Sequence, residues 1–319
     1  MDEPVEVALR VRSLSRGFAG VAAVQDLGFE VRRGEIFGLV GPDGAGKTST
    51  LRMLAGVMRA DAGSIELDGI DVLADPEAAK LHLSYMPQRF GLYEDLSVRE
   101  NVAFYAALFG LSRSRREARA GELLAAAGLA GFERRLAGTL SGGMKQKLGL
   151  VCALIHEPRV LLLDEPTTGV DPVSRRDFWE ILYRLRDDGV AIVMATAYMD
   201  EAERCSRLAL LHAGRLRLCD TPRGLKQAMP GALFSVSGPA ARAIRDAVRG
   251  VPGVLGVLLM GDRVHVRVHD AAQGPALIAG ALAARGLAQP ALAEAEPGIE
   301  DVFVALLDEP AAGDAGRAP

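Results

Sequence analysis

The stretch GPDGAGKT at residues 41–48 constrains this chain more than any other feature of its sequence. An apolar run, 35–40, precedes it, and a pattern typical of a helix, 47–58, follows it. Glycines in such a turn let backbone N–H groups point inward around phosphate oxygens, and the helix start adds further donors. The alternative, a glycine turn that happens to precede a lysine, is disfavoured by this context. The sequence therefore predicts an α/β fold with a phosphate-binding loop.

The loop residues divide into those that surround the phosphates and those that carry charge or bind metal. Lys47 is expected to reach the β- and γ-phosphates, and the Thr48 hydroxyl is expected to bind Mg²⁺. A carboxylate at Asp43 is unfavourable near phosphate unless it faces solvent or a basic side chain. The residues expected to hold the nucleotide here are Gly41, Pro42, Asp43, Gly44, Ala45, Gly46, Lys47, Thr48 and Ser49.

A second apolar run, VLLLDEP at 160–166, ends in two acids. Acids at the end of a buried strand are costly unless they have partners or a function. Asp164 is expected to bind Mg²⁺ directly or through water, and Glu165 to polarise a water molecule that attacks the γ-phosphate. The alternative, an acidic surface turn, is disfavoured because the preceding strand is uniformly apolar.

The stretch LSGGMKQK at 140–147 stands at the start of a helical segment. Ser141 is a plausible N-cap, and Gly142 and Gly143 would let a second anion approach the backbone. An SGG triplet alone is most often a linker. Its position in the chain gives it meaning, because it follows the glycine loop, Gln88 and a helical insert, and precedes the acidic strand.

In this order, the motifs resemble those of the nucleotide-binding subunits of ABC transporters, over about residues 5–225. The resemblance identifies 41–48 as the Walker A motif, 160–164 as Walker B and 140–144 as the signature motif. It implies that the cofactors are ATP and Mg²⁺.

Three further residues receive roles from the same resemblance. Gln88 would centre the glutamine loop and bind the metal, and Asp171 would belong to the D-loop. Phe18 falls where the family stacks an aromatic ring on adenine, although an aromatic residue in a strand is more often part of the core.

The resemblance also implies the fold class and the domain organisation. We expect a P-loop NTPase core with an antiparallel β subdomain and an α-helical subdomain, followed by a small α+β module. The expected boundaries are 1–228 for the ATPase domain, about 97–155 for its helical subdomain and 229–308 for the C-terminal accessory domain. The Ala-, Gly- and Pro-rich tail, 309–319, is expected to be disordered.

The family works as a head-to-tail dimer, in which the Ser141-Gly142-Gly143 segment of one subunit covers the ATP of the other. This chain has one set of motifs, so we expect it to need a second nucleotide-binding subunit and separate membrane permease subunits. It would lie peripherally at the cytoplasmic face of the inner membrane. The segments 87–110 and 297–307 resemble those of drug and antibiotic exporters.

Composition limits the other partners. The net charge of −4 gives no electrostatic reason to expect nucleic acid as a partner. The 3 cysteines lie far apart in apolar segments, which is typical of reduced thiols. No apolar run approaches the ~20 residues needed to span a bilayer, so we expect a soluble chain.

One position departs from the family in a way that matters for catalysis. After the strand at 190–195, exporters of this type usually have Thr-His-Tyr-Met, and this chain has Ala197 in place of the histidine. The family's histidine contacts the γ-phosphate, which alanine cannot do. Loss of a group that stabilises the transition state costs ~2.7–4 kcal/mol.

The sequence thus predicts an ATPase subunit that energises export of a small molecule but is slow at its own site. Its dimer partner would be a different chain with an intact histidine, and a homodimer remains possible. An alternative is a regulatory ATP-binding subunit that does not hydrolyse ATP. A non-transport ABC protein is disfavoured, because such proteins usually carry two motif sets or long coiled coils.

Overall fold

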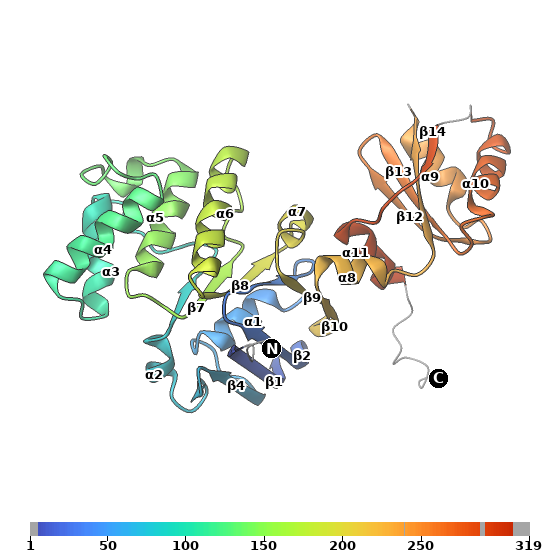
Figure 1. Cartoon of the computed structure of the whole chain (residues 1–319). Helices are drawn as coiled ribbons and strands as arrows, with labels where there is room; N and C mark the ends of the chain where they lie inside the picture. The colour runs from blue at the N-terminus through green and yellow to red at the C-terminus, as the bar shows by residue number, and fades with distance from the viewer. Residues whose placement is uncertain (1–5, 239, 288–290, 309–319) are drawn as a thin grey trace, which may run out of the picture. The chain divides into compact units, whose positions relative to one another are not determined.

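The computed structural model describes residues 6–238, 240–287 and 291–308, so the tail expected to be disordered lies outside the described residues. The chain divides into two units, Met1–Cys219 and Asp220–Pro319, which are coloured from blue to yellow and from yellow to red in Figure 1. The division falls before the boundary expected between residues 228 and 229, because the short helix α8 (Pro222–Gln227) lies in the second unit.

A six-stranded sheet forms the centre of the first unit. Its strands, in the order in which they lie side by side, are β10 (Arg215–Asp220), β9 (Arg207–His212), β3 (Ile36–Val40), β8 (Ala191–Thr196), β7 (Val160–Asp164) and β6 (Leu83–Met86). From β9 to β6 neighbouring strands run parallel. Every residue of β3, β7 and β8 is buried, which explains why these strands read as continuous apolar runs.

A second, antiparallel sheet packs on the same core. Its order is β2 (Val21–Arg32), β1 (Val7–Phe18), β4 (Ala62–Leu67) and β5 (Ile70–Asp71). Strands β4 and β5 form a hairpin, because Asp68 and Gly69 both adopt positive φ and reverse the chain.

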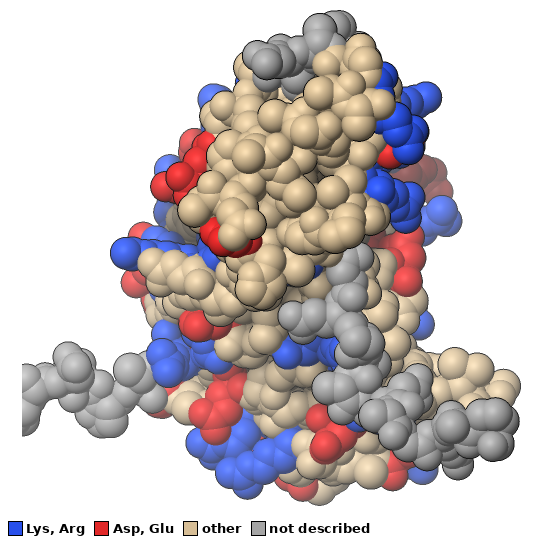
Figure 2. Space-filling model, turned by 90° about the vertical axis from the view of Figure 1, so that its right-hand side faces the viewer, with Lys and Arg blue, Asp and Glu red and all other residues tan. Residues whose placement is uncertain are grey.

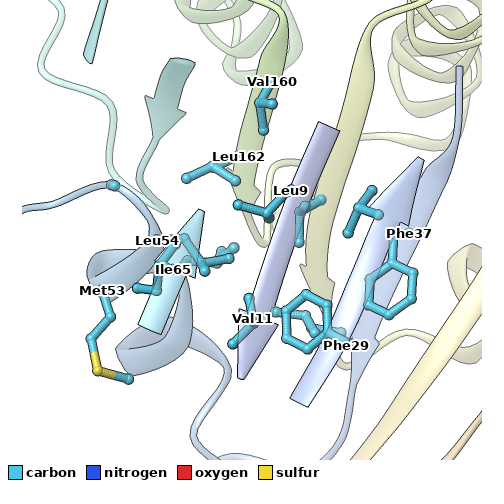
Figure 3. Close-up of a cluster of buried hydrophobic side chains, with 14 of the residues drawn as sticks. Leu9, Val11, Phe29, Phe37, Met53, Leu54, Ile65, Val160 and Leu162 are labelled. Carbon is cyan, nitrogen blue, oxygen red and sulfur yellow. The ribbon is translucent and has the colours of Figure 1, made fainter. Parts of the chain in front are cut away.

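The two sheets share one hydrophobic core around α1 (Lys47–Leu54), part of which is drawn in Figure 3. Phe29 of β2 and Phe37 of β3 stack there with ring centroids 5.0 Å apart. This packing fixes the strand before the glycine loop and the helix after it, so the loop has a rigid support.

The helical part contains α3 (Val98–Leu108), α4 (Arg113–Ala126) and α5 (Gly142–Leu154). Ser97 and Glu100 form a capping box that starts α3. Between α4 and α5 the chain forms no α-helix, although this stretch lies within the expected helical subdomain, 97–155. It contains a short 3₁₀ turn, η1 (Ala137–Thr139). The short helix α2 (Pro76–Lys80) was also not predicted.

Besides α1, which follows β3, two further helices of the first unit follow strands of the central sheet. The longer, α6 (Pro172–Asp187), follows β7, and the Asp171 side chain caps it, with Pro172 at its first position. The short α7 (Met199–Ala202) follows β8.

The second unit is an α+β module with a four-stranded antiparallel sheet. The sheet order is β12 (Val254–Met260), β13 (Arg263–Val268), β11 (Ala232–Ser237) and β14 (Ala291–Glu294). The helices are α8, α9 (Ala241–Val248), α10 (Gly274–Ala283) and α11 (Ile299–Asp308). Val264, Val266 and Val268 alternate along β13 and enter the core of this unit.

The other face of β13 is attached to α11. His265 Nδ1 lies 2.9 Å from Asp301 Oδ1, and the backbone N–H of Gly298 donates to Asp301 Oδ2 at 2.9 Å. Figure 2 shows one face of the molecule, on which a broad area without charged side chains lies beside clusters of Lys, Arg, Asp and Glu. Among the described residues, none of the helices combines the length and the apolar character needed to cross a membrane.

The expected fold class is confirmed, since the first unit contains a parallel sheet with a glycine loop, an antiparallel β part and a helical part.

Candidate functional site

The strand order β3-β8-β7 brings three loops to one edge of the central sheet (Figure 1). The glycine loop leaves β3, the segment containing Ala197 leaves β8, and the segment containing Glu165 leaves β7. Because these strands are parallel neighbours, their carboxyl ends lie side by side. Ligands of open α/β sheets bind at this edge.

Glycines shape the first of these loops where neighbouring backbone comes close. A Cβ on Gly41 would lie 2.3 Å from the Leu211 carbonyl oxygen, and one on Gly46 would lie 2.5 Å from that of Ala23. Gly46 has a φ of 100° at the N-cap of α1, which favours glycine. A Cβ on Gly44 would meet nothing within 4 Å, so this part of the loop is open.

Lys47 lies under the loop and is almost fully buried. Its Nζ donates to the carbonyl oxygens of Gly41 and Pro42 at 2.8 and 3.1 Å. The Asp43 side chain is exposed, which meets the condition under which a carboxylate at this position is tolerated.

Thr48 and Asp164 meet where a metal ion is expected. Thr48 Oγ1 donates to Asp164 Oδ1 at 3.0 Å, and the carboxylate is only 2 % exposed. A hydroxyl and a carboxylate are oxygen ligands suited to Mg²⁺. The donor set therefore fits a magnesium ion bound with nucleotide phosphates.

Tyr85, on the neighbouring strand β6, is a site residue that sequence reasoning missed. Its hydroxyl donates to Asp164 Oδ2 at 3.2 Å. Burial, and then the charge of Asp164, raise the pKa of Tyr85 to about 12, so the hydroxyl stays protonated. The available signal was only its place three residues before Gln88, because the sequence does not show which strand lies beside it.

Glu165 is held by several neighbours. Gln88 Nε2 donates to Glu165 Oε2 at 3.0 Å, and the Thr168 hydroxyl donates to the same oxygen at 3.4 Å. Lys47 Nζ lies 3.7 Å from Oε1. The backbone of Glu165 has a φ of 49°, a strained value for a residue with a side chain.

Ala197 is exposed at the end of β8. Nearby, the Arg175 guanidinium lies 4.9 Å from the centre of the Tyr198 ring and 3.2 Å from Asp200 Oδ2. His156 is held elsewhere, with Nε2 3.1 Å from the Leu83 carbonyl oxygen. The structure thus shows no imidazole at position 197, as the sequence requires.

The signature segment packs against the D-loop. Ser141 caps α5 by accepting from the Met144 N–H at 3.3 Å. Asp171 caps α6 by accepting from the Ser174 N–H at 2.9 Å, and a Cβ on Gly143 would lie 2.4 Å from Ser174 Cβ. Within residues 6–238, no hydrogen bond or ion pair joins the signature segment to the glycine loop.

Phe18 ends β1 and is 42 % exposed, so it is not a core residue. The Arg16 guanidinium lies 5.0 Å from its ring centre and pairs with Asp61. The Gly17 N–H donates to the same carboxylate at 2.8 Å, and this bond, ahead of Arg16, lowers the pKa of Asp61. The Phe18 ring is thus held at the surface in a fixed orientation.

Comparison with protein families places residues 24–168 in a family described as ABC transporter. The chain is 40% identical over 306 residues to the probable multidrug ABC transporter ATP-binding protein YbhF of Escherichia coli, covering 95% of this chain and 52% of that protein. It is 33% identical over 309 residues to the daunorubicin/doxorubicin resistance ATP-binding protein DrrA of Streptomyces peucetius, covering 95% and 93%. The chain therefore spans about half the length of YbhF and nearly all of DrrA.

Among solved structures, an ATP binding subunit of an ABC transporter matches with a TM-score of 0.64 and 32% identity. The match covers 69% of this chain and 92% of that one.

Proposed function

The chain belongs to the ATP-binding proteins of ABC transporters, in their drug-exporter branch, and from that membership we propose that it hydrolyses ATP to energise export of a small molecule. The observation that supports ATP hydrolysis, and not only ATP binding, is the position of the Glu165 side chain. Its carboxylate lies between Lys47 and Gln88, beside the Thr48–Asp164 pair. A carboxylate at this position supports a base that acts on water near the γ-phosphate.

The remaining residues would bind and orient the nucleotide. The N–H groups of residues 41–48 and the Lys47 ammonium would hold the phosphates, and Thr48, Asp164 and Gln88 would hold Mg²⁺. The metal would neutralise charge on the phosphate oxygens. Phe18 would stack on the adenine ring with the face that Arg16 leaves free.

We propose that the site is impaired, because Ala197 cannot contact the γ-phosphate. The segment that carries it keeps its place, since Tyr198 N–H donates to Thr196 Oγ1 at 3.0 Å. The contribution of an imidazole to the transition state would then be missing while its surroundings remain. A regulatory subunit that binds ATP without hydrolysing it is the second candidate, and the same alanine favours it.

The proposed dimer rests on the position of the signature segment. Within residues 6–238, no hydrogen bond or ion pair joins Ser141, Gly142 or Gly143 to the glycine loop of the same chain, and this supports the proposal that they cover the ATP of a second nucleotide-binding subunit. We propose a partner chain with an intact histidine, and separate permease subunits at the cytoplasmic face of the inner membrane. Residues 1–228 would be the ATPase domain and 229–308 an accessory domain.

Steady-state ATP hydrolysis by the purified chain tests the proposal. We expect a low rate in the wild type, abolished by Glu165→Gln, and an increase of up to about 10²- to 10³-fold in Ala197→His. No increase in Ala197→His, with a wild-type rate well above that of Glu165→Gln, would show that the site is not impaired. Equal rates for wild type and Glu165→Gln would instead favour the regulatory subunit.

The double variant with Ala197→His and Glu165→Gln is the control for the increase in hydrolysis rate expected in Ala197→His. It should hydrolyse ATP no faster than Glu165→Gln alone, because the imidazole is expected to assist the reaction that Glu165 promotes.

A further inference from the structure

Glu201 is a fully buried carboxylate with no assigned role. It lies in α7, four residues after Ala197, and is 0% exposed. A buried carboxylate is costly unless its oxygens are hydrogen-bonded. Among the described residues no lysine, arginine or histidine forms an ion pair with it, so its partners are hydroxyl groups.

The two hydroxyls come from the carboxyl ends of two neighbouring strands, β7 and β8. Thr167, which follows β7, donates to Glu201 Oε1, and Thr196, the last residue of β8, donates to Oε2 at 2.5 Å. Both threonines are buried, at 1% and 0% exposure. One carboxylate therefore ties the loop that carries Glu165 to the segment that carries Ala197.

The loop after β7 needs such a tie because it is strained. Glu165 has a φ of 49°, and its N–H donates to the Ala195 carbonyl oxygen at 2.9 Å. Thr168, next to Thr167, donates to the Glu165 carboxylate. The turn is thus attached to the end of β8 by the backbone at one end and by Glu201 at the other.

We propose that Glu201 is a positioning residue that holds the Glu165 loop in its strained conformation through Thr167. This inference rests on the proposed function, because it concerns the placement of the base that would act on water. A displacement of about 1 Å can lower a catalytic rate about 10²-fold. We expect ATP binding to be largely independent of Glu201, because in the part of the chain that the structure describes its carboxylate bonds to Thr167 and Thr196 and not to the glycine loop.

The chain offers a matched control in Glu35. It is another buried glutamate of the first unit, 5% exposed, paired with Arg207 at 3.1 Å and bonded to the Arg32 N–H. It precedes β3 and so lies at the opposite, amino end of the central sheet. Glu35→Gln should lower the unfolding temperature without changing kcat for ATP hydrolysis.

The test compares Glu201→Leu, Thr167→Val, Thr167→Ser and Glu35→Gln in the full chain. Three measurements are made: kcat for ATP, the Kd of a fluorescent ATP analogue, and amide hydrogen exchange in residues 165–170. In Glu201→Leu and Thr167→Val we expect kcat to fall about 10- to 100-fold, Kd to change less than about twofold, and exchange in 165–170 to accelerate. Thr167→Ser, which keeps the hydroxyl, should behave as wild type.

Unchanged kcat and exchange in Glu201→Leu would overturn the inference. So would equal losses of kcat in Glu201→Leu and Glu35→Gln, because these would reflect general destabilisation. If kcat is too low to measure, the same variants are compared in the Ala197→His background. A wild type no faster than Glu165→Gln would contradict the proposed function alone, since exchange in residues 165–170 still decides whether Glu201 holds the loop.

Discussion

Lys47 Nζ lies 3.7 Å from Glu165 Oε1, so the cation expected to bind phosphate and the carboxylate expected to act on water form an ion pair. Both side chains are largely buried, with 5% and 18% of their surface exposed. The pair brings together two residues that are far apart in sequence but follow β3 and β7, which flank β8. Position in the sheet, rather than sequence distance, assembles this site.

Replacing Lys47 tests whether the glycine loop binds ATP. Lys47→Met should raise the Kd of a fluorescent ATP analogue about 10- to 100-fold, because charge-assisted hydrogen bonds to phosphate are lost. Lys80→Met removes a half-buried lysine that pairs only with Glu77 among the described residues, and should leave Kd unchanged. Equal effects of the two substitutions would contradict a specific role for Lys47.

Tyr85→Phe tests whether the tyrosine hydroxyl orients the metal carboxylate. The apparent affinity for Mn²⁺, measured by electron paramagnetic resonance in the presence of ATP, should fall about 10-fold, because Asp164 loses one of its two donors. ATP binding in the presence of a chelator should not change.

The control is Tyr105→Phe, which removes another half-buried hydroxyl of the first unit. That hydroxyl donates to the Gly91 carbonyl oxygen at 2.7 Å, away from Asp164. Mn²⁺ affinity should be retained in this variant, and a loss as large as that in Tyr85→Phe would refute the orienting role.

Gly41→Ala should destabilise the first unit, because the new Cβ would lie 2.3 Å from the Leu211 carbonyl oxygen. We expect a loss of about 1–3 kcal/mol in the free energy of unfolding. Urea denaturation followed by the fluorescence of Trp179, the only tryptophan, reports on this unit. Gly142→Ala, where a Cβ meets nothing within 4 Å, should unfold at the wild-type urea concentration.

His156 should make stability depend on pH. Burial lowers the pKa of this histidine in the folded chain, against a smaller raising effect of its hydrogen bond to Leu83. The unfolded chain therefore takes up a proton first as pH falls, so stability decreases from about pH 6.5 downward.

The midpoint of thermal unfolding, followed through Trp179 fluorescence at about pH 7 and about pH 5.5, checks this dependence. The decrease in unfolding temperature from the higher to the lower pH should be smaller in His156→Gln than in the wild type. The control, His82→Gln, removes another histidine of the same unit and should show the wild-type decrease. Identical drops in all three proteins would rule out His156 as the cause.

The features that could be predicted from the sequence are those set by local pattern. The strand before Gly41, the helix from Lys47 and the buried strand ending at Asp164 each follow from a continuous run of residues. The turn at Asp68 and Gly69 belongs with these features, because an Asp-Gly pair between apolar runs is a typical signal of a two-residue hairpin.

Tertiary contacts account for what the sequence could not show. Tyr85 reaches Asp164 from a neighbouring strand, and Glu201 reaches Thr167 across 34 positions. Neither pairing has a fixed spacing, because it depends on strand order in the sheet. His265 likewise has an acidic partner, Asp301, that lies 36 positions away on α11.

The left-handed backbone of Glu165 has an evolutionary consequence. A residue with a Cβ costs about 1–2 kcal/mol in this conformation, whereas glycine would relieve most of that cost and asparagine part of it. Relatives of this chain that have lost hydrolysis should therefore drift toward glycine or asparagine at this position, gaining stability as they do so. A glutamate retained in spite of that cost would be expected where selection acts on ATP hydrolysis.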